Sequence, residues 1–184
     1  MNFVKGEIEG LFVIEPKVFS DDRGHFYETY SEDLFQEKTG FTGDFVQDNE
    51  SFSFKNVLRG LHFQHPPFAQ AKLVRVIQGE VLDVAVDIRK GSPSYGLHQK
   101  IILSAENKRM FFIPEGFAHG FLTLSETAIF SYKCSNVYAP NCEGGFIWND
   151  PSLGIDWGVN NPIVSAKDAE LVNFDKFASK FLNH

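Results

Sequence analysis

Residues 56–79 of the chain are NVLRGLHFQHPPFAQAKLVRVIQG, an apolar stretch interrupted by long polar side chains. The pattern predicts two β-strands that meet at a turn around Pro66 and Pro67. The polar members of the stretch are Arg59, His62, Gln64, His65 and Lys72. Folding alone does not require them, because a buried charged or polar group is costly unless its hydrogen bonds are satisfied. We therefore interpret the stretch as the lining of a pocket, with solvated strand residues or paired core residues as the alternative.

Short segments of strand character flank this stretch on both sides and are separated by Gly, Pro, Asn or Ser-Glu breaks. The predicted strands outside the pocket stretch are 10–19, 25–30, 45–50, 81–88, 99–103, 109–113, 120–124 and 128–134. Short strands at this spacing are typical of an all-β barrel or sandwich. The length of 184 residues fits one domain, spanning residues 1–184, that buries a substantial core.

The pattern also predicts one hairpin and two helices. Residues 78–80, Gln-Gly-Glu, predict a hairpin turn between strands 73–77 and 81–88. A capping serine, acidic residues in the first turn and a final glycine predict a helix over 31–40. A second helix is expected to begin at residue 165 and to run towards residue 181.

Composition limits the kinds of partner. The formal net charge is −7, which disfavours general binding to a nucleic-acid backbone. Cys134 and Cys142 do not form a CxxC pair and are too few for a disulfide scaffold. The first residues, MNFVKGEIEGLFVIEP, lack a long apolar core before a cleavage site, and no run approaches membrane-spanning length. We therefore expect a cytoplasmic protein without a membrane partner.

Strand alternation indicates which polar residues point inward. Residues i and i+2 lie on the same face, so Lys72 is expected to share the inward face of Val74 and Val76. A buried lysine is unusual without a partner or a task. Tyr132 falls among the apolar positions of its strand and His119 follows a Pro-Gly turn, and both residue types are commonly structural in such places.

The histidines do not have the spacing of a metal site. His62 and His65 are three residues apart, so a regular strand directs them oppositely, and no HxH, HExxH or CxxC occurs. A histidine base, a tyrosine acid and a lysine beside an oxyanion instead form a set suited to removing a proton next to a carbonyl. The carboxylate that orients the base could be Asp83, Asp87 or Asp168, which the spacing does not separate.

Several long motifs resemble the dTDP-4-dehydrorhamnose 3,5-epimerases. They are RGLHFQHPPFAQAKLVRVIQGEVLDVAVDIRKGSPSYG from residue 59, IPEGFAHGFLTLSE from residue 113, SYKCSNVYAP from residue 131 and NDPSLGIDW from residue 149. The resemblance extends from the region of Pro16 to Asp168, nearly the full chain. It implies a cupin-type jelly-roll β-barrel and a homodimer in which strands pack across the interface.

The resemblance also implies roles for particular residues. His62 matches the general base, Asp168 its carboxylate partner, Tyr132 the acid that delivers a proton from the opposite face, and Lys72 the residue beside the C4 oxygen. Matches to sugar, phosphate, nucleotide or thymine contacts are Phe19, Arg23, Glu28, Gln47, Asn49, Arg59, His119, Tyr138, Glu143 and Lys167. The basic members can pair with a diphosphate although the chain is acidic.

The reaction implied is epimerisation of dTDP-4-dehydro-6-deoxy-α-D-glucose at C3 and C5, giving dTDP-4-dehydro-β-L-rhamnose in dTDP-L-rhamnose biosynthesis. The C4 ketone of the substrate acidifies both positions, so no metal or organic cofactor is expected. The alternatives are an epimerase of one carbon or of another nucleotide-linked sugar, a 3,4-ketoisomerase of similar fold, and a non-catalytic nucleotide-sugar binding protein. The pair His62 and Tyr132 argues against the ketoisomerase, and the presence of both with Asp168 argues against the binding protein.

Overall fold

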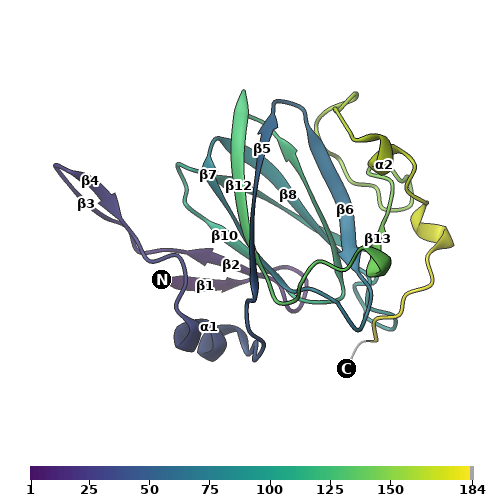
Figure 1. The fold of residues 1–184 in the computed structure, drawn as a ribbon, viewed down its shortest axis with the longest axis horizontal. Helices are drawn as coiled ribbons and strands as arrows, with labels where there is room; N and C mark the ends of the chain where they lie inside the picture. Colours follow the sequence, from purple (N-terminus) through teal and green to yellow (C-terminus); the bar gives the residue numbers. More distant parts are fainter. Residues whose placement is uncertain (183–184) are drawn as a thin grey trace.

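The computed structural model describes residues 1–182, which form two large antiparallel β-sheets packed face to face (Figure 1). The first sheet has the order β1 (Asn2–Lys5), β2 (Phe12–Glu15), β10 (Met110–Ile113), β7 (Lys72–Gln78), β12 (Thr127–Cys134) and β5 (Gln47–Phe54). The second has the order β13 (Glu143–Gly145), β6 (Leu58–Gln64), β11 (Phe117–Thr123), β8 (Glu80–Asp87) and β9 (His98–Ser104). The prediction of an all-β sandwich is confirmed.

The hydrophobic core lies between the two sheets. Val74 and Phe130 of the first sheet pack with Val81, Ala85 and Phe121 of the second, and the rings of Phe121 and Phe130 stack with centroids 4.2 Å apart. The outer face of the second sheet carries a separate apolar layer covered by the C-terminal segment. Both faces of β8 are therefore buried, which explains why its apolar residues are nearly continuous.

The pocket stretch connects the two sheets. The predicted strands on either side of Pro66 and Pro67 are confirmed as β6 and β7, and the Pro66-Pro67 peptide bond is cis. β6 belongs to the second sheet and β7 to the first, so the chain crosses between the sheets at this turn. His62 and Lys72 consequently lie on opposite walls of the sandwich.

The hairpin predicted at residues 78–80 is wrong. β7 pairs with β10 and β12, whereas β8 pairs with β9 and β11, so the turn again carries the chain from one sheet to the other. Gly79 has φ +81°, and a Cβ there would collide with the backbone carbonyl of Thr127. The turn residues specify a tight reversal, but they do not specify whether the next strand pairs in the same sheet.

The N-terminal helix is confirmed as α1 (Glu32–Thr39), which ends at Gly40 in the left-handed conformation. The long C-terminal helix is wrong: α2 covers only Ala166–Ala169, and a 3₁₀ turn, η2 (Phe174–Lys176), follows it. Phe174 at the start of η2 and Phe177 just after it instead pack against Phe146, with ring centroids 5.1 and 4.8 Å away. This packing on the second sheet outweighs the weak local preference for a helix.

The remaining elements lie at the edges of the sandwich. The predicted strand 10–19 is divided at Pro16 into β2 and the start of a hairpin, β3 (Phe19–Asp21) and β4 (Gly24–Phe26). This hairpin projects away from the sandwich (Figure 1). A 3₁₀ turn, η1 (Pro140–Cys142), precedes β13. Within residues 1–182 there is no helix with the length and apolar character needed to span a membrane.

Candidate active site

A cleft opens between the sheets where β6, β7, β11 and β12 meet. Its larger part has a volume of about 510 Å³ and is lined in part by Arg59, His119 and Asp168. A neighbouring part of about 290 Å³ is lined in part by Gln47, Asn49, Gln64, Gln70, Tyr138 and Glu143. His62, Lys72 and Tyr132 line both parts. The three residues predicted to carry the chemistry therefore lie together where the two parts join.

His62 on β6 is held by Asp168 at the end of the chain's short helix α2. The Nε2 atom of His62 lies 2.8 Å from Asp168 Oδ1, and the Gly60 amide donates to Asp168 Oδ2 at 3.3 Å. Ser165 Oγ accepts a hydrogen bond from the Asp168 amide at 3.0 Å and so fixes the start of α2. Burial alone would raise the pKa of Asp168, but its interactions with His62 and Gly60 lower it below the ordinary value. An ionised Asp168 therefore holds Nε2–H and leaves Nδ1 of His62 as the basic atom.

The structure shows which of the three candidate carboxylates is the partner of His62. Asp83 bonds to His119, and Asp87 accepts hydrogen bonds from Arg89, so Asp168 is the partner of His62. Asp168 is 106 residues from His62 in the chain, and only the fold brings them together.

Tyr132 and Lys72 lie on neighbouring strands of the sheet that faces His62. In the register of β12 and β7, Tyr132 is opposite Val74 and Cys134 is opposite Lys72. The Lys72 Nζ atom lies 6.0 Å from the centroid of the Tyr132 ring. Burial raises the pKa of the Tyr132 phenol, with a further contribution from Cys134, so the phenol stays protonated at neutral pH. Tyr132 is therefore available as a proton donor.

Lys72 is enclosed by protein atoms although some of its surface remains exposed in the cleft. Desolvation lowers its pKa, and the nearby carboxylates Asp83 and Glu143 act in the opposite direction, as would Cys134 in its thiolate form. A cation that is weakly solvated and directed into a cleft is suited to stabilising negative charge on a substrate oxygen.

Basic side chains gather on one side of the larger part of the cleft. Arg59 is fixed by Ser53 Oγ at 3.1 Å and by the Phe52 carbonyl at 3.2 Å. His119 and Lys167 line the same part. Together they form a site suited to an anionic group such as a diphosphate.

The rim of the cleft is closed by a hydrogen-bonded group around Glu143. Lys167 Nζ lies 2.6 Å from Glu143 Oε2, and the Tyr138 hydroxyl donates to the same oxygen at 2.7 Å. Gln47 accepts a hydrogen bond from the Tyr138 amide at 3.0 Å and donates to Asn49 Oδ1 at 3.0 Å. These five predicted contact residues are thus brought together beside His62 and Tyr132.

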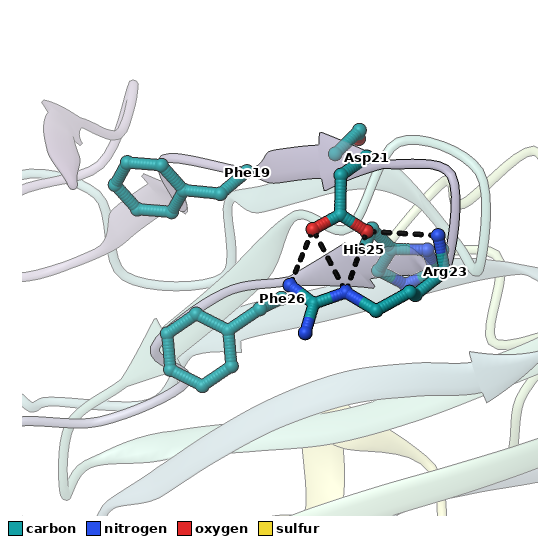
Figure 2. A pocket seen from close by; sticks show the side chains of 7 residues that line it. Phe19, Asp21, Arg23, His25 and Phe26 are labelled. Atoms are coloured by element: carbon teal, nitrogen blue, oxygen red, sulfur yellow. Dashed lines mark hydrogen bonds and ion pairs between the residues drawn. The ribbon is translucent and has the colours of Figure 1, made fainter.

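Three predicted contact residues lie apart from this cleft. Phe19 and Arg23 belong to the projecting hairpin, where they line a separate hollow of about 540 Å³. Figure 2 shows the Arg23 guanidinium bonded to Asp21, with the rings of Phe19 and Phe26 on the same side of the hairpin. Glu28 follows β4 and does not line the cleft formed within residues 1–182. One copy of the chain does not bring these residues to His62.

The sequence-based prediction also missed some lining residues. Ser51 on β5 lines the larger part, and its hydroxyl is buried without a hydrogen-bond partner within residues 1–182. Ser51 is two residues after Asn49 and four after Gln47, so alternation along one strand was the signal that could have identified it. Ile163 and Val164 also line the cleft, but they come from irregular chain that carries no periodic pattern.

A jelly-roll sandwich with a His–Asp pair, a tyrosine and a lysine in one cleft defines a cupin-type protein whose cleft is suited to acid–base chemistry. The chain belongs to the dTDP-4-dehydrorhamnose 3,5-epimerase family, whose model matches residues 5–176.

Individual relatives agree with this assignment. The chain is 56% identical over 170 residues to the dTDP-4-dehydrorhamnose 3,5-epimerase of Salmonella typhimurium, covering 92% of this chain and 93% of the relative. It is similar to the structure of the dTDP-6-deoxy-D-glucose-3,5-epimerase from Legionella pneumophila in complex with dTDP-4-keto-L-rhamnose. The TM-score is 0.94 and the identity 48%, with 98% of this chain and 96% of that chain covered.

A more distant structure carries a different printed activity. The 3'-monoepimerase from Streptomyces bikiniensis, in complex with dTDP-quinovose, is 34% identical with a TM-score of 0.86, covering 92% of this chain and 86% of that chain. The fold is therefore shared by enzymes named for one carbon and for two.

Proposed function

We propose that this chain epimerises dTDP-4-dehydro-6-deoxy-α-D-glucose at C3 and C5, giving dTDP-4-dehydro-β-L-rhamnose. The observation that carries the proposal is the opposition of His62, held by Asp168, to Tyr132 and Lys72 on the facing sheet. A base and an acid on opposite walls can act on opposite faces of a sugar ring between them, which is what inversion at a carbon requires.

The chemistry follows from the C4 ketone of the substrate. His62 Nδ1 removes the proton from C3 or C5, while Asp168 keeps the ring oriented and stabilises the imidazolium that forms. The electron pair moves into the C4 carbonyl, and Lys72 stabilises the resulting enolate oxygen. Tyr132 then donates a proton to the same carbon from the other face. Because the ketone accepts the electron pair, the reaction needs no metal or organic cofactor.

The rest of the cleft suits a nucleotide diphosphate. Arg59, His119 and Lys167 supply basic or polar groups for the diphosphate and sugar. Tyr138 is 55% exposed at the rim, where its ring is available to stack on a thymine base. Gln47, Asn49 and Glu143 complete this side of the proposed binding site.

The test is proton exchange in deuterated water. The chain is incubated with the 4-keto substrate, and deuterium at C3 and C5 is followed by NMR together with the configuration of the product. Exchange and inversion at both carbons are expected. Exchange confined to one carbon would instead identify a single-carbon epimerase, and binding without exchange at either carbon would support a non-catalytic binding protein.

We further propose that two copies of the chain form the functional unit, with the β3–β4 hairpin of one copy completing the cleft of the other. Phe19 and Phe26 on the hairpin are 54% and 70% exposed, which is unusual for large apolar rings without a partner. Within one copy the hairpin projects from the sandwich (Figure 1). The second copy would bring Phe19, Arg23 and Glu28 to the nucleotide.

A complementation experiment checks this arrangement. His62→Ala removes the base, and Phe19→Ala with Arg23→Ala in one chain removes the hairpin contacts, so each preparation alone should have little activity. After denaturation and refolding together, mixed dimers should contain one intact site each, and about a quarter of the wild-type activity should return. Light scattering should show a dimer throughout. A monomer, or no recovery from refolded mixtures with wild-type yield, would contradict the proposed exchange of hairpins.

The two cysteines support a cytoplasmic location, which we also propose. Cys134 and Cys142 are both free thiols, and free thiols are typical of proteins in a reducing compartment.

A further inference from the structure

Asp83 is a buried carboxylate in the cleft region that the proposed reaction has not used. It lies on β8 with a side chain that is 0% exposed, and its strand position is opposite Phe121 of β11. Both of its oxygens contact His119 Nε2, at 2.9 and 3.1 Å. A buried carboxylate is costly unless its charge is compensated, so its position asks for an explanation.

The contact with Asp83 determines which nitrogen of His119 carries a proton. An ionised carboxylate only accepts hydrogen bonds, so Nε2 carries the hydrogen and Nδ1 is the remaining polar atom. Within the part of the chain that the structure describes, no hydrogen bond is found for Nδ1. The imidazole lines the larger part of the cleft and stacks on Phe130 with ring centroids 6.0 Å apart. Its Nδ1 atom is therefore available to a bound molecule.

Asp83 also acts on Lys72, which has no ion pair within residues 1–182. The titratable groups that face Lys72 are Tyr132 and Cys134 on β12, Asp83 on β8, Glu143 on β13, His62 on β6 and His119 on β11. Burial raises the pKa of the Cys134 thiol, so it is neutral at pH 7. Glu143 is already bound to Lys167 and Tyr138. Asp83 and Glu143 are thus the carboxylates whose charge favours a protonated Lys72.

We propose that Asp83 is a positioning residue for the epimerase reaction, fixing the orientation and tautomer of His119. This inference rests on the proposed function. Asp83 serves the cleft-lining His119 on β11 in the way that Asp168 serves His62 on β6. The cleft then contains two His–Asp pairs with different tasks.

The first readout is independent of activity. In the free wild-type protein, ¹⁵N NMR of the imidazole rings should show His119 with its hydrogen on Nε2. Asp83→Asn keeps the size of the side chain, but an amide can either donate or accept, so the variant should lose the single tautomer. An identical His119 spectrum in wild type and variant would overturn the proposal, whatever reaction the protein catalyses.

The second readout is the pH dependence of kcat/KM. Removing the negative charge of Asp83 makes protonation of Lys72 less favourable, so Lys72 loses its proton at a lower pH. The alkaline decline in activity should therefore begin at a lower pH in Asp83→Asn than in wild type. At pH 7 we expect a loss of about 10–100-fold in kcat, and a wild-type kcat in Asp83→Asn would overturn the proposal.

Matched variants separate these effects from simple destabilisation. Asp87→Asn removes another carboxylate of β8 that is 0% exposed, but one that is bound to Arg89 away from the cleft. It should lower the melting temperature without changing the His119 tautomer or the pH profile. In a His119→Ala background, Asp83→Asn should add less than its effect on wild type, because the histidine that it positions is already absent. If wild type itself shows no exchange, the epimerase proposal fails, whereas the tautomer readout still tests Asp83.

Discussion

Replacing His62 with alanine is expected to reduce proton exchange at both C3 and C5 by about 10³–10⁴-fold. His62 presents the one basic nitrogen that a buried, ionised Asp168 orients into the cleft, and the same atom serves both carbons. Stopped incubations in deuterated water with NMR detection measure the exchange. The loss should be in kcat, with KM for the substrate changed little, because His62 acts on the proton rather than on the nucleotide.

His65 provides a control from the same stretch. The His65 side chain points away from the cleft, and its ring stacks with that of Phe181. Its Nδ1 atom is buried without a hydrogen-bond partner within residues 1–182. His65→Phe keeps an aromatic ring in this packing and should retain wild-type exchange. Retention of more than about a tenth of the activity in His62→Ala would exclude His62 as the general base.

Replacing Lys72 with methionine is expected to lower kcat by about 10²–10³-fold and at the same time to stabilise the fold. Methionine has a similar length but cannot stabilise an enolate oxygen. Desolvation lowers the pKa of Lys72 in the folded chain, so charging it destabilises the fold at neutral pH. Removing that charge should raise the free energy of unfolding by about 1–2 kcal/mol at pH 7.

The stability difference between Lys72→Met and wild type should also depend on pH. The penalty for a charged Lys72 is complete below its folded pKa and disappears as the pH rises towards the value for an unfolded lysine, about 10.4. The stability advantage of Lys72→Met should therefore shrink as the pH is raised into that range. Chemical unfolding at several pH values measures it. A variant that is less stable than wild type at pH 7, with a normal m-value, would show that Lys72 is a structural ion-pair partner instead.

The sequence specified the strands better than it specified their pairing. The predicted bounds of β7, β8 and β12 lie within one residue of the observed ones, because at least one face of each strand is buried. It could not show that the turn at Gly79 carries the chain to the opposite sheet, because that depends on contacts between distant segments. The C-terminal helix was wrong for the same reason: Phe174 and Phe177 have a helical spacing, but they pack on Phe146 from a short 3₁₀ turn and the residue after it.

The site was likewise predictable in its residue types but not in its pairings. Polar positions in apolar strands identified His62 and Lys72 as unusual, whereas Tyr132 occupied a position where a tyrosine is commonly structural. The choice of Asp168 over Asp83 as the partner of His62 depended on a resemblance to known enzymes, since no spacing rule connects residues so far apart. The structure then showed that Asp83 has a histidine of its own.

The most direct test of the account is the effect of Tyr132→Phe on exchange and inversion, measured together in deuterated water. His62 removes protons from one face of the sugar and Tyr132 donates them to the other. The variant should therefore still exchange protons through His62 but form inverted product about 100-fold more slowly. Deuterium should then appear at the acidic carbons of substrate that keeps its original configuration. Inversion at the wild-type rate in Tyr132→Phe would contradict the assignment of Tyr132 as the opposing acid.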